Sequence, residues 1–275
     1  MPTSAPSSRR LLWAGFLAIT VWGSIAGLLG AVLPALRERA GLSLDGSGGV
    51  FVALSCGLVV ASLVAGPLLD RLGKKPVLAA AAALVCGSLL AFEVVNSLGG
   101  LLLLAFTMGA GGSALVTGGH PLVAGLNPPH RPAGLNLLAF FFGLGAFVTP
   151  FAIVPLQARF GLAAVLAVLA ALAALVLVYL LATRFPAPAH AREFSMGHAA
   201  GLLTQPAFLL PALLVFLYVG AEQSVWDWQV TYFMQHLAID NVTAARMLSV
   251  FPVAIMIGRV VNTRLLMRVS PAPVL

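Results

Sequence analysis

The chain has 275 residues, of which 60% are hydrophobic and 8% are charged, and its mean hydropathy is +1.04. A soluble globular domain carries about 25% charged residues, so this chain has too little polar surface to cover a globule in water. The composition excludes a cytosolic enzyme, a disordered chain and a disulfide scaffold, and it favours a polytopic membrane protein. The basic residues behind the net charge of +7 form no dense patch, which argues against nucleic acid binding.

Neither cysteine has a neighbourhood that suggests chemistry. Cys56 and Cys86 lie inside apolar runs, without a CxxC pair or a nearby histidine, so we expect no metal or redox site and no cofactor. The apolar run after Arg9 and Arg10 is too long for the core of a cleaved signal peptide, and we interpret it as a first membrane span.

Apolar runs divide the chain into eight predicted spans. Each is long enough to cross a bilayer as a helix, so the predicted class is an all-α polytopic membrane protein. A longer connector rich in proline follows the sixth run, and it divides the chain into a six-helix bundle (1–183), a cytoplasmic linker (184–206) and a partial second bundle (207–275). The eight runs are 11–36, 47–69, 77–95, 98–125, 133–156, 160–182, 207–235 and 244–266.

The basic residues of the connectors predict the orientation. Cytoplasmic loops of membrane proteins carry an excess of lysine and arginine. One side would hold Arg9, Arg10, Arg71, Lys74, Lys75, Arg131, Arg184, Arg192, Arg264 and Arg268, and the other only Arg37, Arg39, Arg159 and Arg246. This bias predicts a cytoplasmic N-terminus, in a bacterial cytoplasmic membrane.

A short internal repeat links the two parts. Residues 66–78 and 263–275 match at six of thirteen positions without gaps, at an offset of 197 residues. The same offset places the first span on the seventh and the second on the eighth. Parallel repeats of six helices are a transporter architecture, with the substrate site at the repeat interface.

At residues 66–78 the sequence resembles the signature loop of the major facilitator superfamily, G-x-L-a-D-R-x-G-R-K-x-x-L. Its positions are occupied by Gly66, Leu68, Asp70, Arg71, Gly73, Lys74, Lys75 and Leu78. The resemblance implies a fold of twelve helices, of which about eight are present, and a conformational rather than a substrate-binding role for this loop. We expect Gly66 and Gly73 to allow tight packing and a sharp turn.

More narrowly, the chain resembles the fucose permease-like branch of sugar:proton symporters. The stretches 135–138, 142–146 and 218–222, with Trp226, Gly258 and Arg259, carry this resemblance. It implies a small polar substrate, such as a sugar, and proton coupling. Val116 stands where those symporters carry an acid in the fourth span.

The seventh span holds most of the candidate transport residues. At 100° per residue, Tyr218, Glu222, Trp226 and Gln229 fall on one stripe, whereas Gln223, Asp227 and Thr231 fall on a second. Glu222 lies near the middle of the run, where a carboxylate must face water, pair, or hold a proton. We therefore expect Glu222 to exchange protons, although it could instead only bond a neighbouring helix.

The other candidates have competing structural interpretations. His120 in the fourth span could replace the missing acid as a proton carrier, or be structural. Asn136 could bind substrate or bond between helices, and Asp227 could line the pathway or the rim of a cavity. Trp228 and Tyr232 suit an interfacial aromatic belt. The glycines of the first and fourth spans favour close helix packing: Gly23, Gly27, Gly30, Gly109, Gly111, Gly112, Gly118 and Gly119.

These observations predict a secondary transporter of a small polar solute that works by alternating access and uses protons. Its expected partners are the solute, protons and the lipid bilayer. The absence of metal-ligand spacing, a nucleophile motif or a phosphate loop argues against an enzyme. The repeat predicts about 390 residues for two full halves, so the alternative is a truncated membrane protein that does not transport, either a gene fragment or a substrate sensor.

Overall fold

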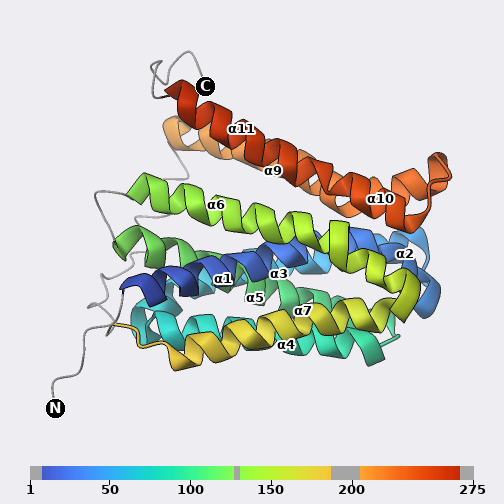
Figure 1. Ribbon diagram of the computed structural model, residues 1–275, viewed down its shortest axis with the longest axis horizontal. Coiled ribbons are helices and arrows are strands. Elements are labelled where there is room, and N and C mark those ends of the chain that lie inside the picture. The colour runs from blue at the N-terminus through green and yellow to red at the C-terminus, as the bar shows by residue number, and fades with distance from the viewer. Residues whose placement is uncertain (1–7, 127–130, 187–204, 267–275) are drawn as a thin grey trace.

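The computed structural model describes residues 8–126, 131–186 and 205–266, and the regular structure of these residues is helical throughout (Figure 1). The predicted linker and the second signature copy fall largely outside the described residues, at 187–204 and 267–275. The helices are α1 (Ser8–Ala26), α2 (Leu29–Ala40), α3 (Leu44–Leu72), α4 (Lys74–Val94), α5 (Leu98–Leu126), α6 (Arg131–Val148), α7 (Gln157–Ala182), α9 (Pro206–His236), α10 (Asn241–Leu248) and α11 (Val250–Leu266).

The first predicted span is broken into two helices. The axes of α1 and α2 differ by 49°, and the break lies at residues 27–28. Gly27 sits against the backbone carbonyl of Ala146 and the ring of Pro150, so the break packs directly on the fifth predicted span. The pair together is long and apolar enough to cross a membrane once.

The described helices account for the eight predicted spans. Six stretches, or seven with the bent pair, are long and apolar enough to cross a membrane. One of them, Ala133–Ala182, has 50 residues, more than twice the length that a span needs. It passes through a π-turn (Thr149–Ile153) and a 3-10 turn (Val154–Leu156), and α6 and α7 run in opposite directions on either side (Figure 1). We therefore count it as two spans.

Close helix packing through glycines holds the N-terminal bundle together. A Cβ atom on Gly57 of α3 would collide with the backbone of Phe106 in α5, and one on Gly109 of α5 would collide with the backbone of Leu54 in α3. Each helix therefore contributes a glycine that lets the backbone of the other approach closely. Gly23 meets the carbonyl of Phe142 in the same way, where α1 packs on α6. The prediction that the glycines of the first and fourth spans serve helix packing is confirmed for Gly23 and Gly109, whereas the role of Gly57 was not predicted.

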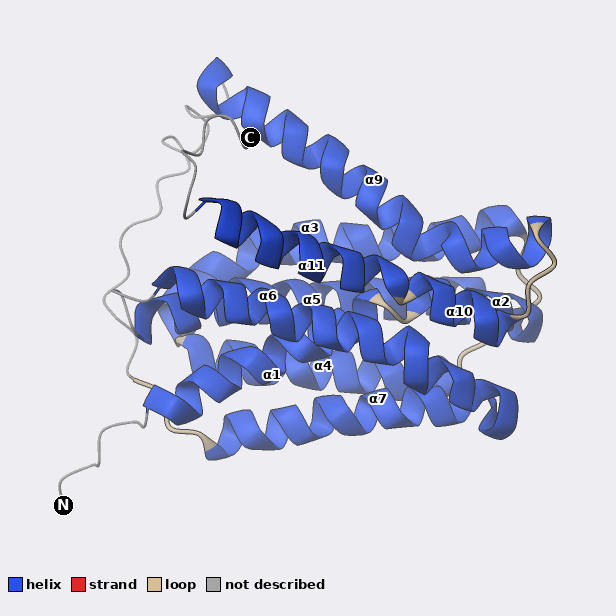
Figure 2. Ribbon diagram, turned by 45° about the horizontal axis from the view of Figure 1, so that its top comes forward, coloured by secondary structure: helices blue, strands red, loops and turns tan. Residues whose placement is uncertain are grey.

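The bundle has two distinct ends, which we name for the features they carry. The loop end holds the α3–α4 connection at Gly73, and the pocket end holds the end of α2 and the end of α9. Helix α9 packs on α2 and α10 near the pocket end, but every residue from 206 to 221 is exposed. Figure 2 shows α9 diverging from the rest of the chain toward the loop end.

Candidate functional site

The first candidate site is the middle of α9, where the structure brings three predicted residues together. Trp226 is buried, and its indole Nε1–H donates to Glu222 Oε1 over 3.5 Å. Tyr218, one turn further toward the loop end, lies close enough to feel the charge of Glu222. At a rise of about 1.5 Å per residue, Glu222 is close to the midpoint of this 31-residue helix. The predicted stripe therefore carries a carboxylate close to the middle of α9.

A cation from the eighth span belongs to this group. Arg259 in α11 lies within electrostatic range of Tyr218. The rings of Trp226 and Phe251 meet edge to face at 5.2 Å, which fixes the pocket-end half of α9 against the start of α11. Arg259 was recognisable in the sequence as a charge inside an apolar run, but its proximity to the Glu222 stripe depends on how α9 and α11 pack.

Helix α9 also contacts α2, next to Trp226 and Asp227. A side chain on Gly30 would collide with the backbone carbonyls of Trp226 and Asp227, so α2 and α9 touch there through main chain. Of the second stripe, Gln223 and Asp227 are partly buried and Thr231 is buried; Gln229, from the first stripe, is also partly buried. The side-chain oxygens of Gln229 and Thr231 are enclosed and have no hydrogen-bond partner within the protein.

The two aromatic residues expected at the interface differ in their surroundings. Trp228 packs edge to face on Phe51 of α3 at 5.4 Å and is only partly exposed. Tyr232 is 54% exposed and contacts Phe233 and His236 on its own helix. Trp228 therefore joins α9 to α3 through a ring contact.

His120 and Asn136 lie apart from the α9 stripe. His120 is exposed, and its Nδ1 is 3.0 Å from the Val116 carbonyl of its own helix. The carbonyl of Pro121, its neighbour, accepts a hydrogen bond from Lys74, which places His120 near the loop end. Asn136 is exposed near the start of α6, toward the same end.

The signature loop forms a sharp turn at the loop end. Gly73 has φ 86° and ψ 167°, a conformation that is open essentially only to glycine. Lys74 donates to the Pro121 carbonyl of α5, and Lys75 to the Leu181 carbonyl of α7 over 2.6 Å, so the loop is tied to two further helices. Asp70 and Arg71 remain exposed.

The expectation of tight packing is wrong for Gly66. A side chain built on Gly66 meets nothing within 4 Å, so this part of α3 faces open space among the described residues. Only Gly73 has the geometric role that we expected of both glycines.

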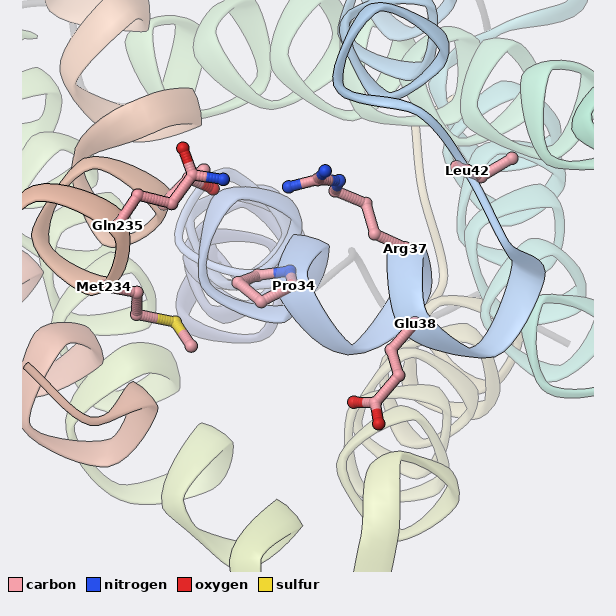
Figure 3. A pocket seen from close by; sticks show the side chains of 7 residues that line it. Pro34, Arg37, Glu38, Leu42, Met234 and Gln235 are labelled. Atoms are coloured by element: carbon pink, nitrogen blue, oxygen red, sulfur yellow. The ribbon is translucent and has the colours of Figure 1, made fainter. Parts of the chain in front are cut away.

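The second candidate site is a pocket of about 330 Å³ at the pocket end, between α2 and α9 (Figure 3). Its lining was not predicted, because the two helices are almost 200 residues apart in the sequence. The walls are formed by Pro34, Arg37, Glu38, Leu42, Thr231, Met234 and Gln235. No group of three or more histidine, cysteine, aspartate or glutamate side chains suited to a metal occurs in the described part of the chain.

Comparison with known proteins defines the family. A sequence profile of the Major Facilitator Superfamily matches residues 11–275. The chain therefore belongs to the major facilitator superfamily and is an integral membrane protein. The superfamily consists of transporters, so the chain is not an enzyme.

Solved structures support the same fold. A D-xylose–proton symporter superposes on 94% of this chain and 69% of its own, with a TM-score of 0.69 and 14% identity. The fucose:proton symporter of E. coli superposes on 94% of this chain and 72% of its own, with a TM-score of 0.66 and 22% identity. At these identities the likeness concerns the fold alone.

Two curated relatives are more similar in sequence. The 4-hydroxybenzoate transporter PcaK of Pseudomonas aeruginosa is 32% identical over 190 residues, which are 68% of this chain and 42% of the relative. PcaK of Acinetobacter baylyi is 30% identical over 144 residues, 50% of this chain and 31% of the relative. The chain thus matches less than half the length of these curated relatives.

Proposed function

We propose that this chain functions in secondary active transport of a small organic solute across a bacterial cytoplasmic membrane, with proton coupling through Glu222. Transport follows from membership of the superfamily. The observation that carries the coupling is the Glu222–Trp226 hydrogen bond at the middle of α9, with Tyr218 and Arg259 close by. A carboxylate at this depth is costly unless it is paired or holds a proton, so gain and loss of a proton would change the forces between α9 and α11.

For the substrate we propose an aromatic acid. The curated relatives at about 30% identity are transporters of 4-hydroxybenzoate. Trp226 and Tyr218 provide aromatic faces for an aromatic ring, and Arg259 supplies a cation for a carboxylate. The second candidate is a sugar. It is favoured by the fucose permease-like stretches at 135–138, 142–146 and 218–222 and by the same aromatic residues.

The shape of the chain suits alternating access. Helix α9 is packed at the pocket end and exposed over 206–221 toward the loop end. The arginine and lysine bias assigns the loop end to the cytoplasm. We propose that this arrangement corresponds to a state open toward the cytoplasm, in which the contact of Gly30 with the Trp226 carbonyl closes the outer side.

The direct test of coupling is Glu222→Gln, which keeps the size and hydrogen bonding of the side chain but cannot carry a proton. We expect it to abolish uptake driven by a proton gradient, measured with labelled 4-hydroxybenzoate in cells or proteoliposomes. Glu93→Gln removes an exposed carboxylate near the end of α4 and should leave uptake unchanged. Undiminished, pH-dependent uptake by Glu222→Gln would disprove this role.

Competition separates the two substrate classes. Unlabelled benzoate should inhibit uptake of labelled 4-hydroxybenzoate, whereas fucose at the same concentration should not. Uptake of labelled fucose that benzoate leaves unaffected would support the sugar instead.

A further inference from the structure

We propose that the pocket between α2 and α9 is a second binding site, which takes an organic carboxylate bearing an apolar ring. Arg37, Thr231 and Gln235 would donate hydrogen bonds to the carboxylate. Figure 3 shows Arg37 and Gln235 directed toward each other from opposite walls. Because both α2 and α9 contribute, the site exists only while the pocket end is closed.

Two polar atoms of residues in the pocket walls have no hydrogen-bond partner within the protein, and a ligand could supply one. Arg37 Nε and Thr231 Oγ1 are both buried without a hydrogen-bond partner. Buried donors in folded proteins are nearly always satisfied by protein, water or ligand. A guanidinium and a hydroxyl together match carboxylate oxygens, which accept hydrogen bonds in pairs from arginine.

The neighbouring charges allow an anion at this position. Glu38 also lines the pocket, but it is exposed, and its carboxylate lies away from the ends of Arg37 and Gln235 in Figure 3. Arg39 does not compete with Arg37 for the ligand, since its guanidinium donates to the carbonyls of Phe92, Glu93 and Val95. Arg37 is therefore the cation of the pocket.

The remaining walls select the body of the ligand. Pro34, Leu42 and Met234 are apolar and partly buried. A volume of about 330 Å³ lies at the lower end of the range for small-molecule sites, which suits one ring with one carboxylate. The methionine thioether adds a flexible contact for an aromatic face.

The choice of an aromatic acid as ligand rests on the proposed function, whereas the anionic character of the site rests on Arg37 and Thr231 alone. The pocket lies at the pocket end, where α9 packs on α2. The exposed part of α9 lies on the other side of Glu222, toward the loop end. The pocket would hold the anion before or after it passes the site around Glu222.

Benzoate binding to the purified protein, measured by calorimetry, tests the site. Arg37→Gln should weaken binding at least about tenfold, as expected for the loss of a hydrogen bond to a charged group. Thr231→Val, which keeps the shape of the side chain, should weaken it several-fold, and Glu38→Gln should strengthen it. Benzyl alcohol, which has the ring but no charge, should not compete.

Arg159→Gln is the matched control, because it removes the same charge from an exposed residue at the same end of the chain. It should bind benzoate as the unmodified protein does. Equal weakening by Arg159→Gln, unchanged binding by both Arg37→Gln and Thr231→Val, or no benzoate binding at all would overturn the inference. Thermal unfolding of each variant checks that the fold is intact.

The two proposals fail separately. Glu222→Gln should abolish coupled uptake and leave the Arg37-dependent binding of benzoate unchanged. Absence of uptake by the unmodified protein, with this binding retained, would reject the transport proposal only. Normal uptake with benzoate binding that does not depend on Arg37 or Thr231 would reject the pocket only.

Discussion

Trp226 combines packing and polar roles in one side chain, and the two can be separated by substitution. Its ring packs on Phe251, it is 1% exposed, and its N–H bonds Glu222. Trp226→Ala should lower the free energy of unfolding by about 3 kcal/mol, because it leaves a cavity where α9 meets α11. Trp226→Phe should retain most of the stability and lose the hydrogen bond.

Denaturation of the purified protein in detergent measures both effects. The control is Tyr218→Phe, which alters a residue that is 55% exposed and should change stability little. Equal losses for Trp226→Ala and Trp226→Phe would show that the hydrogen bond, rather than the packing, holds the ring in place.

At the residue scale, helical periodicity predicts some of these neighbours and not others. It places Tyr218, Glu222 and Trp226 on one stripe, and the structure confirms that they adjoin. Each residue of an α-helix is rotated by about 100° from the one before it, so the spacing of residues in the sequence predicts which side chains share a stripe. Arg37 and Thr231 line the same pocket only because α2 packs on α9, so their proximity depends on tertiary contacts that no local pattern encodes.

At the scale of elements, the turn between α3 and α4 depends on one glycine. Gly73→Ala should reduce stability by about 1–3 kcal/mol, the cost of forcing a side chain into this conformation. Gly66→Ala is the matched control. It lies within α3 and faces open space, so a methyl group should be tolerated or slightly stabilising.

Thermal unfolding of the two variants compares them directly. If Gly66→Ala were as destabilising as Gly73→Ala, the loop would require small residues for packing and not for its backbone conformation. If neither mattered, the turn would have an alternative geometry that is compatible with a side chain.

The span positions were predictable, but their irregularities were not. Apolar length alone places α3, α4, α5 and α9 within a few residues, because a bilayer requires a continuous apolar helix. The break at residues 27–28 and the π-turn at Thr149–Ile153 both lie inside continuous apolar runs. The apolar pattern that predicts the spans therefore gives no sign of them. Pro150 and Pro155 mark the second irregularity, although proline in a membrane span does not by itself determine its geometry.

At the scale of the whole molecule, the repeat and the signature loop predict the superfamily fold, and the sequence match over 11–275 confirms it. The divergence of α9 from the bundle had no counterpart in the sequence. Gly23 is buried against α6, whereas Gly220, its equivalent in the repeat, faces open space among the described residues. Equivalent positions can thus have different neighbours, because the conformation decides which helix faces meet.

The orientation in the membrane is the property of the whole molecule that charge alone predicts. Asp70 at the loop end and Asn96 at the pocket end are both exposed and lie outside the apolar segments or at their margin. With Cys56 and Cys86 replaced by serine, we expect Asn96→Cys to react with a membrane-impermeant maleimide in intact cells. Asp70→Cys should react only after permeabilisation, because the basic residues Arg71, Lys74 and Lys75 predict a cytoplasmic position for the loop.

Labelling of both variants in permeabilised cells shows that each site is accessible, and the chain without cysteine gives the background. The reverse pattern, with Asp70→Cys labelled in intact cells, would place the loop end outside. The open side of α9 would then face the exterior, and the Arg37 pocket would sample cytoplasmic rather than external carboxylates. The same experiment therefore shows which side of the membrane the closed pocket end faces and which side the exposed half of α9 faces.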